Sequence, residues 1–235
     1  MEALKAAKKF IDNYFPDCLV AFLAGSVVRG EATKTSDLDI VVISSTIESA
    51  YRESFYKYGW PIEVFVHTKE SYKVFFKMDI ENRVPSLPRM CSEGITLKDV
   101  ADLAKVIKDE ANKLLSQGVM AFTEQELHNQ RYLITDRLDD LVGAKNSDQE
   151  IFLVNELTEV IANFILVNSG RWKSKGKWIP KSLKQLDEKL YLQLMNSLDE
   201  FYKKDNKKDF VNFVETQLSR FGGKLFDGYS IGKKD

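Results

Sequence analysis

Two neighbouring stretches, residues 23–30 and 36–43, constrain this chain more than any other part of it. An apolar run ends at a Gly25-Ser26 corner, and a polar loop then leads to a second apolar run that opens with Asp37 and Asp39. Alternate side chains of a strand share a face, so the two carboxylates would lie close together. Adjacent carboxylates resist joint ionisation unless a cation lies between them. Hard oxygen ligands beside a corner suited to phosphate favour Mg²⁺.

Composition and charge exclude several classes of protein. The chain has 235 residues, 44% of them hydrophobic, which is enough for one large domain or two small ones. A net charge of −1 gives no general attraction to nucleic acid or to an anionic membrane, so neither is an expected partner. Two cysteines do not make a disulfide framework, and no apolar run approaches the roughly 18 residues of a membrane span. We expect a cytoplasmic protein with reduced thiols.

The hydrophobic pattern changes character near residue 98. Before it, we expect a helix over residues 4–15, strands over 18–24 and 38–43, a hairpin over 51–67 and an edge strand at 95–97. Pro85 and Pro88 are expected to bracket an irregular segment. After it, helical spacing recurs in five segments, at 100–117, 124–142, 149–168, 182–198 and 209–221. The sequence therefore predicts an α+β protein, with an α/β domain over residues 1–98 that contains a small mixed sheet, and a helical bundle over residues 99–235.

Glu63 adds a third carboxylate to the pair. It lies in the alternating strand of residues 62–66, on the same face as Phe65, with no basic residue beside it in that strand. Taken singly, Glu63 could face solvent, the aspartates could belong to a loop, and Gly25-Ser26 could be an ordinary turn. A P-loop is excluded because Glu31 stands where that motif requires lysine. Three acids on successive strand segments beside a Gly-Ser corner are far more specific than any one of them, since unpaired buried carboxylates are costly.

This pattern resembles the DNA polymerase beta-like nucleotidyltransferase superfamily. The motif covers residues 23–63, and the wider likeness, which includes segments 60–67 and 85–90, covers about the first 98. The helical second half makes the layout similar to that of the antibiotic nucleotidyltransferases that modify aminoglycosides and lincosamides. The resemblance implies that Gly25 and Ser26 contact the nucleoside triphosphate, and that Asp37, Asp39 and Glu63 bind two Mg²⁺ ions. From the same loop we add Arg29 and Ser36 as nucleotide ligands.

The chemistry implied by this resemblance is an in-line displacement at phosphorus. Asp37 and Asp39 would hold the ion at the β- and γ-phosphates, and with Glu63 a second ion at the α-phosphate. A substrate hydroxyl would attack and pyrophosphate would leave. The general base is either Glu63 or an acid of the helical half.

The helical half offers candidates for the remaining contacts. Two polar stripes are either solvated surface or the lining of a site for a cationic or polyhydroxyl acceptor: Asn129, Tyr132, Asp136 and Asp140, and then Glu156, Glu159 and Asn163. The segment 171–178 is basic and carries two tryptophans, which suits a solvated turn, a nucleic-acid patch, or a lysine that reaches the triphosphate. The resembling enzymes commonly use a lysine from their helical half for this contact. Here the resemblance leaves Lys173, Lys175, Lys177 and Lys181 open, and Lys177 is the candidate that we name.

Together these features predict a Mg²⁺-dependent nucleotidyltransferase that moves AMP from ATP, or another nucleoside monophosphate, onto a hydroxyl of a small molecule. An aminoglycoside- or lincosamide-type antibiotic is the leading acceptor, and a homodimer is compatible with the apolar helices. Two alternatives stay open. One is a protein-modifying nucleotidyltransferase of a toxin-antitoxin pair. The other is a non-catalytic nucleotide-binding regulatory module, which the intact set of acids disfavours.

Overall fold

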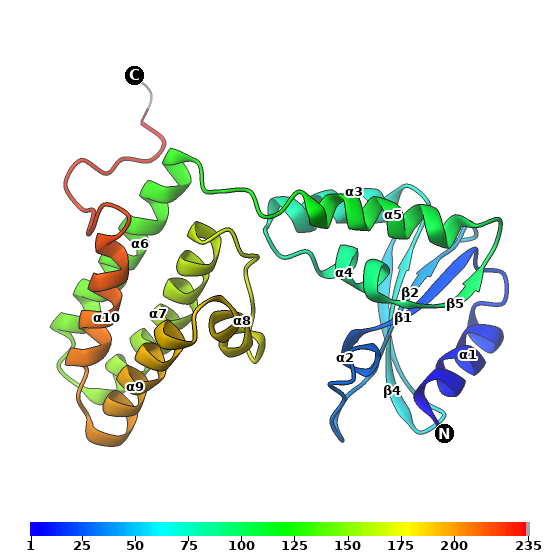
Figure 1. Ribbon diagram of the computed structural model, residues 1–235, viewed down its shortest axis with the longest axis horizontal. Coiled ribbons are helices and arrows are strands. Elements are labelled where there is room, and N and C mark those ends of the chain that lie inside the picture. The colour runs from blue at the N-terminus through cyan, green and yellow to red at the C-terminus, as the bar shows by residue number, and fades with distance from the viewer. Residues whose placement is uncertain (234–235) are drawn as a thin grey trace. The chain divides into compact units, whose positions relative to one another are not determined.

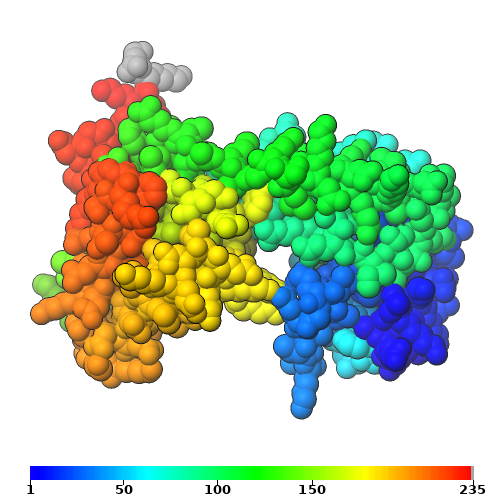
Figure 2. Space-filling view, viewed as in Figure 1, coloured from blue at the N-terminus to red at the C-terminus, as the bar shows by residue number. Residues whose placement is uncertain are grey.

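The computed structural model describes residues 1–233. The chain divides into two compact units, Met1–Gly118 and a second unit that begins at Val119 (Figure 1). Each unit has hydrophobic core clusters of its own, so each is described by itself. In the first unit, the loop that leads from the Gly-Ser corner to the two aspartates projects from the surface (Figure 2).

The first unit is built on a five-stranded mixed sheet with the strand order β3-β4-β2-β1-β5. Its strands are β1 (Val20–Ala24), β2 (Leu38–Ile43), β3 (Tyr51–Lys57), β4 (Trp60–His67) and β5 (Ile95–Asp99). Strands β2 and β4 pair in parallel, whereas the other neighbouring strands pair antiparallel. The parallel pair aligns Asp39 with Glu63, so the strand register makes these two acids direct neighbours.

Helices cover both faces of this sheet. They are α1 (Ala3–Tyr14), α2 (Gly25–Val28), α3 (Ser71–Glu81), α4 (Ser86–Glu93) and α5 (Leu103–Ser116). One core joins α1 to the face that carries Ile40, and a second core joins α3, α4 and α5 to the face that carries Val41. Because side chains alternate along a strand, Asp39 projects on the same face as Val41. The acids therefore lie on the three-helix face.

The second unit contains helices and connecting loops, with no strand among its described residues. Its helices are α6 (Glu124–Gly143), α7 (Ser147–Asn168), α8 (Trp178–Leu186), α9 (Glu188–Lys204) and α10 (Lys208–Ser219). Fully buried residues such as Leu138, Ile161 and Phe210 form a single core between them. Helix α6 begins with a capping box between Thr123 and Glu126, which satisfies amides that would otherwise lack partners. Within the described chain, no helix combines the length and the apolar character needed to cross a membrane.

The predicted α+β class is confirmed, with its mixed sheet and its helical second half, but the segment after α3 was predicted wrongly. Residues 86–93 form helix α4 instead of an irregular segment. Pro88 is the third residue of that helix, where a backbone N–H has no intrahelical acceptor, so proline is tolerated. The Asp79 carboxylate also accepts a hydrogen bond from the Leu87 amide at 2.7 Å and thereby caps the helix start.

Two further details differ from the expected pattern. Helix α5 shares a core with α3 and α4, so the first unit ends at Gly118, whereas we drew the boundary at residue 98 where the strands end. The helix expected over residues 182–198 is two helices, because the chain breaks at Asp187. The carboxylate of Asp187 accepts a hydrogen bond from the Leu190 amide at 3.0 Å and caps the start of α9.

Candidate active site

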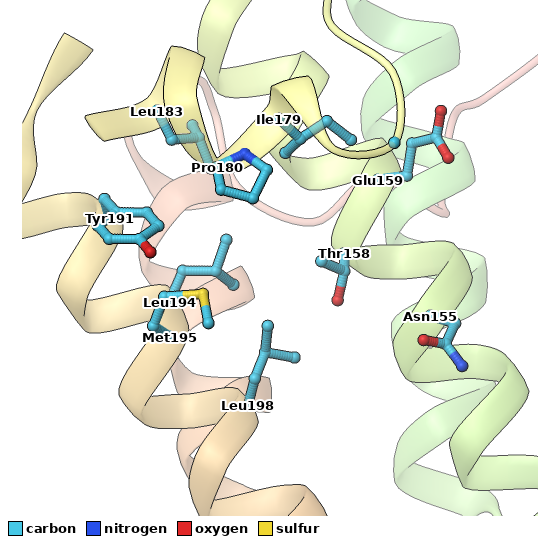
Figure 3. A pocket seen from close by; sticks show the side chains of 11 residues that line it. Asn155, Thr158, Glu159, Ile179, Pro180, Leu183, Tyr191, Leu194, Met195 and Leu198 are labelled. Carbon is cyan, nitrogen blue, oxygen red and sulfur yellow. The ribbon is translucent and has the colours of Figure 1, made fainter. Parts of the chain in front are cut away.

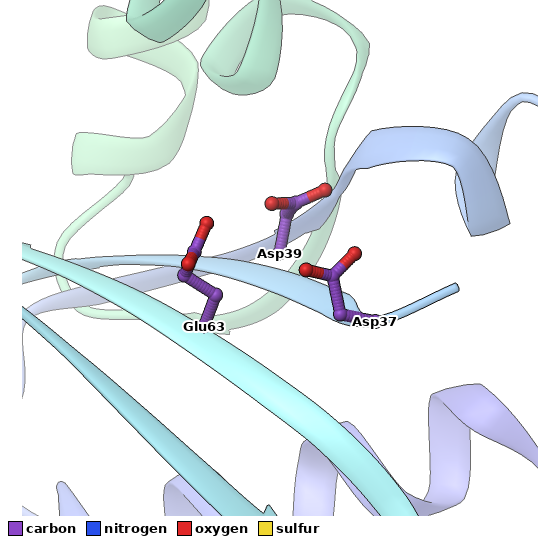
Figure 4. Close-up of side chains that lie close together, drawn as sticks. All are labelled: Asp37, Asp39 and Glu63. Carbon is purple, nitrogen blue, oxygen red and sulfur yellow. The ribbon is translucent and has the colours of Figure 1, made fainter. Parts of the chain in front are cut away.

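Three carboxylates converge at one end of the parallel strand pair (Figure 4). Asp37 immediately precedes β2, Asp39 lies within it, and Glu63 comes from β4. One ligand oxygen of each lies within 4.8 Å of the others, and all three residues are half-buried. Hard oxygen donors at this spacing suit a divalent cation such as Mg²⁺. The structure thus brings together all three acids that the sequence singled out.

The electrostatics of Asp39 show that this cluster lacks a counter-charge of sufficient strength. The pKa of Asp39 is raised to about 6, chiefly by burial and then by the nearby carboxylates of Asp37 and Glu63. Arg29 and Arg52 oppose the rise without cancelling it. A divalent cation among these oxygens would favour the ionised form, so the donor set fits a metal.

Gly25 lies directly against the Asp39 side chain. Its φ of +78° lies in the left-handed region that favours glycine, at the point where β1 ends and α2 begins. A Cβ at this position would stand 1.9 Å from the Asp39 carboxylate oxygen Oδ2, which is closer than any real contact. Only a residue without a side chain therefore fits between the corner and the second aspartate.

The other predicted nucleotide ligands of the first unit line the loop beside this corner. The Ser26 hydroxyl donates to Ser36 Oγ at 3.2 Å, and the Thr33 amide donates to the same oxygen at 2.8 Å. Arg29 Nε pairs with Glu31 at 3.1 Å, and its Nη1 pairs with Glu93 at 3.4 Å. The loop is held by its own polar side chains, with both serine hydroxyls next to each other.

Arg52 forms an ion pair with Glu63 and was not among the predicted site residues. Glu63 has no basic neighbour within its own strand, and Arg52 lies on the neighbouring strand β3. In the antiparallel register Arg52 stands opposite Phe65, one step along the same face from Glu63. A careful alignment of the two arms of the predicted hairpin could have found it.

Lys177 belongs to the second unit, and its role in binding the triphosphate stays a prediction. Its side chain is exposed, and its Nζ lies 5.4 Å from the ring centroid of Trp178. Lys181 approaches the same ring at 5.4 Å, so the tryptophan organises two of the four candidate lysines.

The polar stripe on α6 is covered by the C-terminal segment of the same unit. Tyr229 stacks on Tyr132 with ring centroids 3.9 Å apart, and its hydroxyl donates to Asn129 Oδ1 at 3.2 Å. Arg131 holds the segment in place by donating to the carbonyl oxygens of Gly222 and Gly223 at 2.5 and 2.9 Å. These contacts occupy much of the surface that was a candidate for acceptor binding.

Arg137 neutralises acids of both stripes. Its Nη1 pairs with Asp136 at 2.7 Å, and its Nε pairs with Glu156 on α7 at 2.8 Å. On the same helix, Asn163 accepts a hydrogen bond from the Ser174 amide at 2.8 Å. Glu159 differs from them, because among the described residues it has no ion-pair partner.

Glu159 lies at the margin of a pocket of about 330 Å³ between α7, α8 and α9 (Figure 3). The pocket walls are mainly apolar, with Ile179 and Pro180 of α8 above and Leu194 and Leu198 of α9 to one side. Asn155 and Thr158 are further polar residues in the lining. The second unit therefore offers an amphipathic pocket with one carboxylate at its edge.

One comparison with known proteins, the match to a family model, falls within the first unit. The family model described as a nucleotidyltransferase domain matches residues 4–93, which include all three carboxylates and Gly25. Among solved structures, a nucleotidyltransferase-like protein from Exiguobacterium sibiricum is similar to the chain at 13% identity and a TM-score of 0.47, covering 94% of this chain and 74% of that one. No curated protein gives a significant match.

Domains of this family transfer a nucleoside monophosphate from a nucleoside triphosphate and generally use a divalent metal, for which the three acids form a candidate site. Residues 4–93 are therefore a nucleotidyltransferase domain of the DNA polymerase beta-like superfamily, and this chain is a transferase enzyme.

Proposed function

We propose that this enzyme transfers AMP from ATP to a hydroxyl group of a small molecule, with Mg²⁺ as the metal. The observation that carries the proposal is the convergence of Asp37, Asp39 and Glu63 within 4.8 Å, beside a glycine whose missing side chain makes room for Asp39. Such an arrangement opposes the charged form of Asp39, because it raises the pKa of that carboxyl to about 6, and a bound cation would relieve this cost.

In this proposal each residue of the first unit has a definite task. Asp37, Asp39 and Glu63 hold two divalent ions, and Ser26, Ser36 and Arg29 bind the phosphates near Gly25. When bound, the ions neutralise charge on the phosphate oxygens and make the acceptor hydroxyl easier to deprotonate. Glu63 accepts that proton as general base.

In this proposal the chain after residue 98, which includes the second unit, binds the acceptor. Lys177 of the second unit binds the triphosphate. The acidic stripes of this unit are partly neutralised by Arg137 or covered by the C-terminal segment, which disfavours a polycationic aminoglycoside. The apolar pocket with Glu159 at its margin suits an acceptor that has an apolar body and a single positive charge. A lincosamide-type antibiotic fits this description better.

The test is pyrophosphate release from each of the four ribonucleoside triphosphates with Mg²⁺, against aminoglycosides, lincosamides and cell lysate. The wild type would be run beside Asp39→Asn and beside Asp12→Asn, which removes an exposed carboxylate from α1. We expect release from ATP that requires one small-molecule acceptor, disappears in Asp39→Asn and persists in Asp12→Asn.

Other outcomes would overturn the proposal in distinct ways. Release with lysate alone would identify a protein acceptor, as in the toxin-antitoxin alternative. Binding of nucleotide without any release would identify a regulatory module. Release that persists in a folded Asp39→Asn protein would refute the assignment of the three acids.

A further inference from the structure

Two features position the Arg52 side chain beside Glu63: the pairing of β3 with β4, and the ring of Phe65. Arg52 stands opposite Phe65 in the β3–β4 register, and its Cζ lies 5.0 Å from the centroid of that ring. From there its Nη2 reaches Oε1 of Glu63. Arginine favours such a position because its planar guanidinium can lie over an aromatic face and bind a carboxylate at the same time.

The pair is unequal in its exposure to solvent. The Arg52 side chain is 60% exposed, whereas that of Glu63 is 19% exposed. The Arg52 guanidinium is already largely hydrated, so it can leave the ion pair easily. The Glu63 carboxylate stays within the site, and it needs another positive charge when the guanidinium departs.

Arg52 also interacts with the other two acids of the cluster. The hydrogen bond to Glu63 and the charges of Glu63, Asp39 and Asp37 all raise the pKa of the Arg52 guanidinium. In turn Arg52 lowers the pKa of Asp39, against the larger effects of burial and of the neighbouring acids. A single side chain on the edge strand thus supplies positive charge to the whole carboxylate cluster.

We propose that Arg52 is the internal counter-ion of the metal site, holding Glu63 while no divalent cation is bound and competing with such a cation for that carboxylate. This inference rests on the proposed function, since it takes the three acids to be metal ligands. Its consequence is a lowered affinity for free metal, because a cation must displace the guanidinium and also overcome its repulsion. The displaced guanidinium remains over Phe65 beside the acids, where phosphate oxygens are its natural partners. Arg52 therefore acts as a positioning residue that disfavours metal binding before nucleotide arrives.

The experiment measures binding of Mn²⁺ alone to the full chain without nucleotide, by the loss of the free-ion signal in electron paramagnetic resonance. The variants are Arg52→Gln, Arg52→Lys and, as a matched control, Lys57→Gln. Lys57 is an exposed cation on the same strand whose Nζ lies 5.7 Å from the ring of Tyr14. Asp39→Asn identifies binding at the carboxylate site.

We expect Arg52→Gln to bind Mn²⁺ about 3- to 10-fold more tightly than the wild type, the range of a partly exposed ion pair plus the lost repulsion. Arg52→Lys should fall between them, and Lys57→Gln should match the wild type. Unchanged or weaker binding in Arg52→Gln would overturn the inference and leave the proposed function intact. Wild-type binding that persists in Asp39→Asn, or no binding at all, would overturn both.

Discussion

Replacing Asp39 by asparagine should stabilise the metal-free protein at alkaline pH. The structure raises the pKa of this carboxyl from 3.8 to about 6, chiefly through burial and then through Asp37 and Glu63. A shift of about two pH units corresponds to about 3 kcal/mol at roughly 1.36 kcal/mol per unit. Since the carboxyl is only half-buried, solvent screening reduces this energy, and we expect the free energy of unfolding to rise by about 1–2 kcal/mol in the variant.

The sign of the effect depends on pH. A group whose pKa is higher in the folded state than in the unfolded state binds more protons when folded. Its contribution to stability is complete below pH 4 and is lost as the pH rises through about 6. The Asp39→Asn variant has no titrating group at this position. The difference in free energy of unfolding between the variant and the wild type should therefore be near zero at pH 4 and largest near pH 8.

The assay is urea unfolding in excess chelator, with Trp172 and Trp178 replaced by phenylalanine in both proteins. The remaining Trp60 then reports on the first unit alone. An exposed-site control, Asp12→Asn, should show no pH-dependent gain. An Asp39→Asn protein that is no more stable than the wild type at pH 8 would refute the picture of a crowded carboxylate site without a sufficient counter-charge.

Three other perturbations follow from single contacts. Gly25→Ala should abolish Mn²⁺ binding, whereas Gly30→Ala, which has a similar φ of +70° but open space around it, should keep binding and cost about 1 kcal/mol; equal behaviour of the two would contradict the clash with Asp39. Lys207→Met should lower the free energy of unfolding by about 2–3 kcal/mol in chemical denaturation, because Nζ pairs with Glu150 at 2.6 Å and donates to three carbonyl oxygens at the end of α6; an unchanged free energy would show that water replaces it. Burial raises the pKa of the Cys91 thiol, so a thiol reagent should label it only as fast as the protein unfolds, and rapid labelling would disprove its burial.

The sequence was most informative where function imposes a local pattern. The two aspartates, the Gly25-Ser26 corner and the strand of Glu63 all follow from short-range periodicity, whereas the parallel pairing that aligns Asp39 with Glu63 appears only in the structure. The fold class was predictable for the same reason, since alternating strands give way to helical spacing in the second half.

What the sequence did not show depends on contacts between distant residues. Arg52 contacts Glu63 only because of the hairpin register. Tyr229 stacks on Tyr132 although the two residues lie far apart in the sequence. Helix α4 was not predicted, because two prolines lie at its start and the effect of a proline depends on its position within the first turn. Such features are decided by tertiary packing, which a single sequence does not display.

The fit between Gly25 and Asp39 also bears on how genomes are annotated. A homologous chain can retain every acid of the motif and still carry a side chain at the glycine, and a survey that counts only acids would score it as a working enzyme. Scoring the glycine and the second aspartate as one inseparable unit would sort such copies from functional genes.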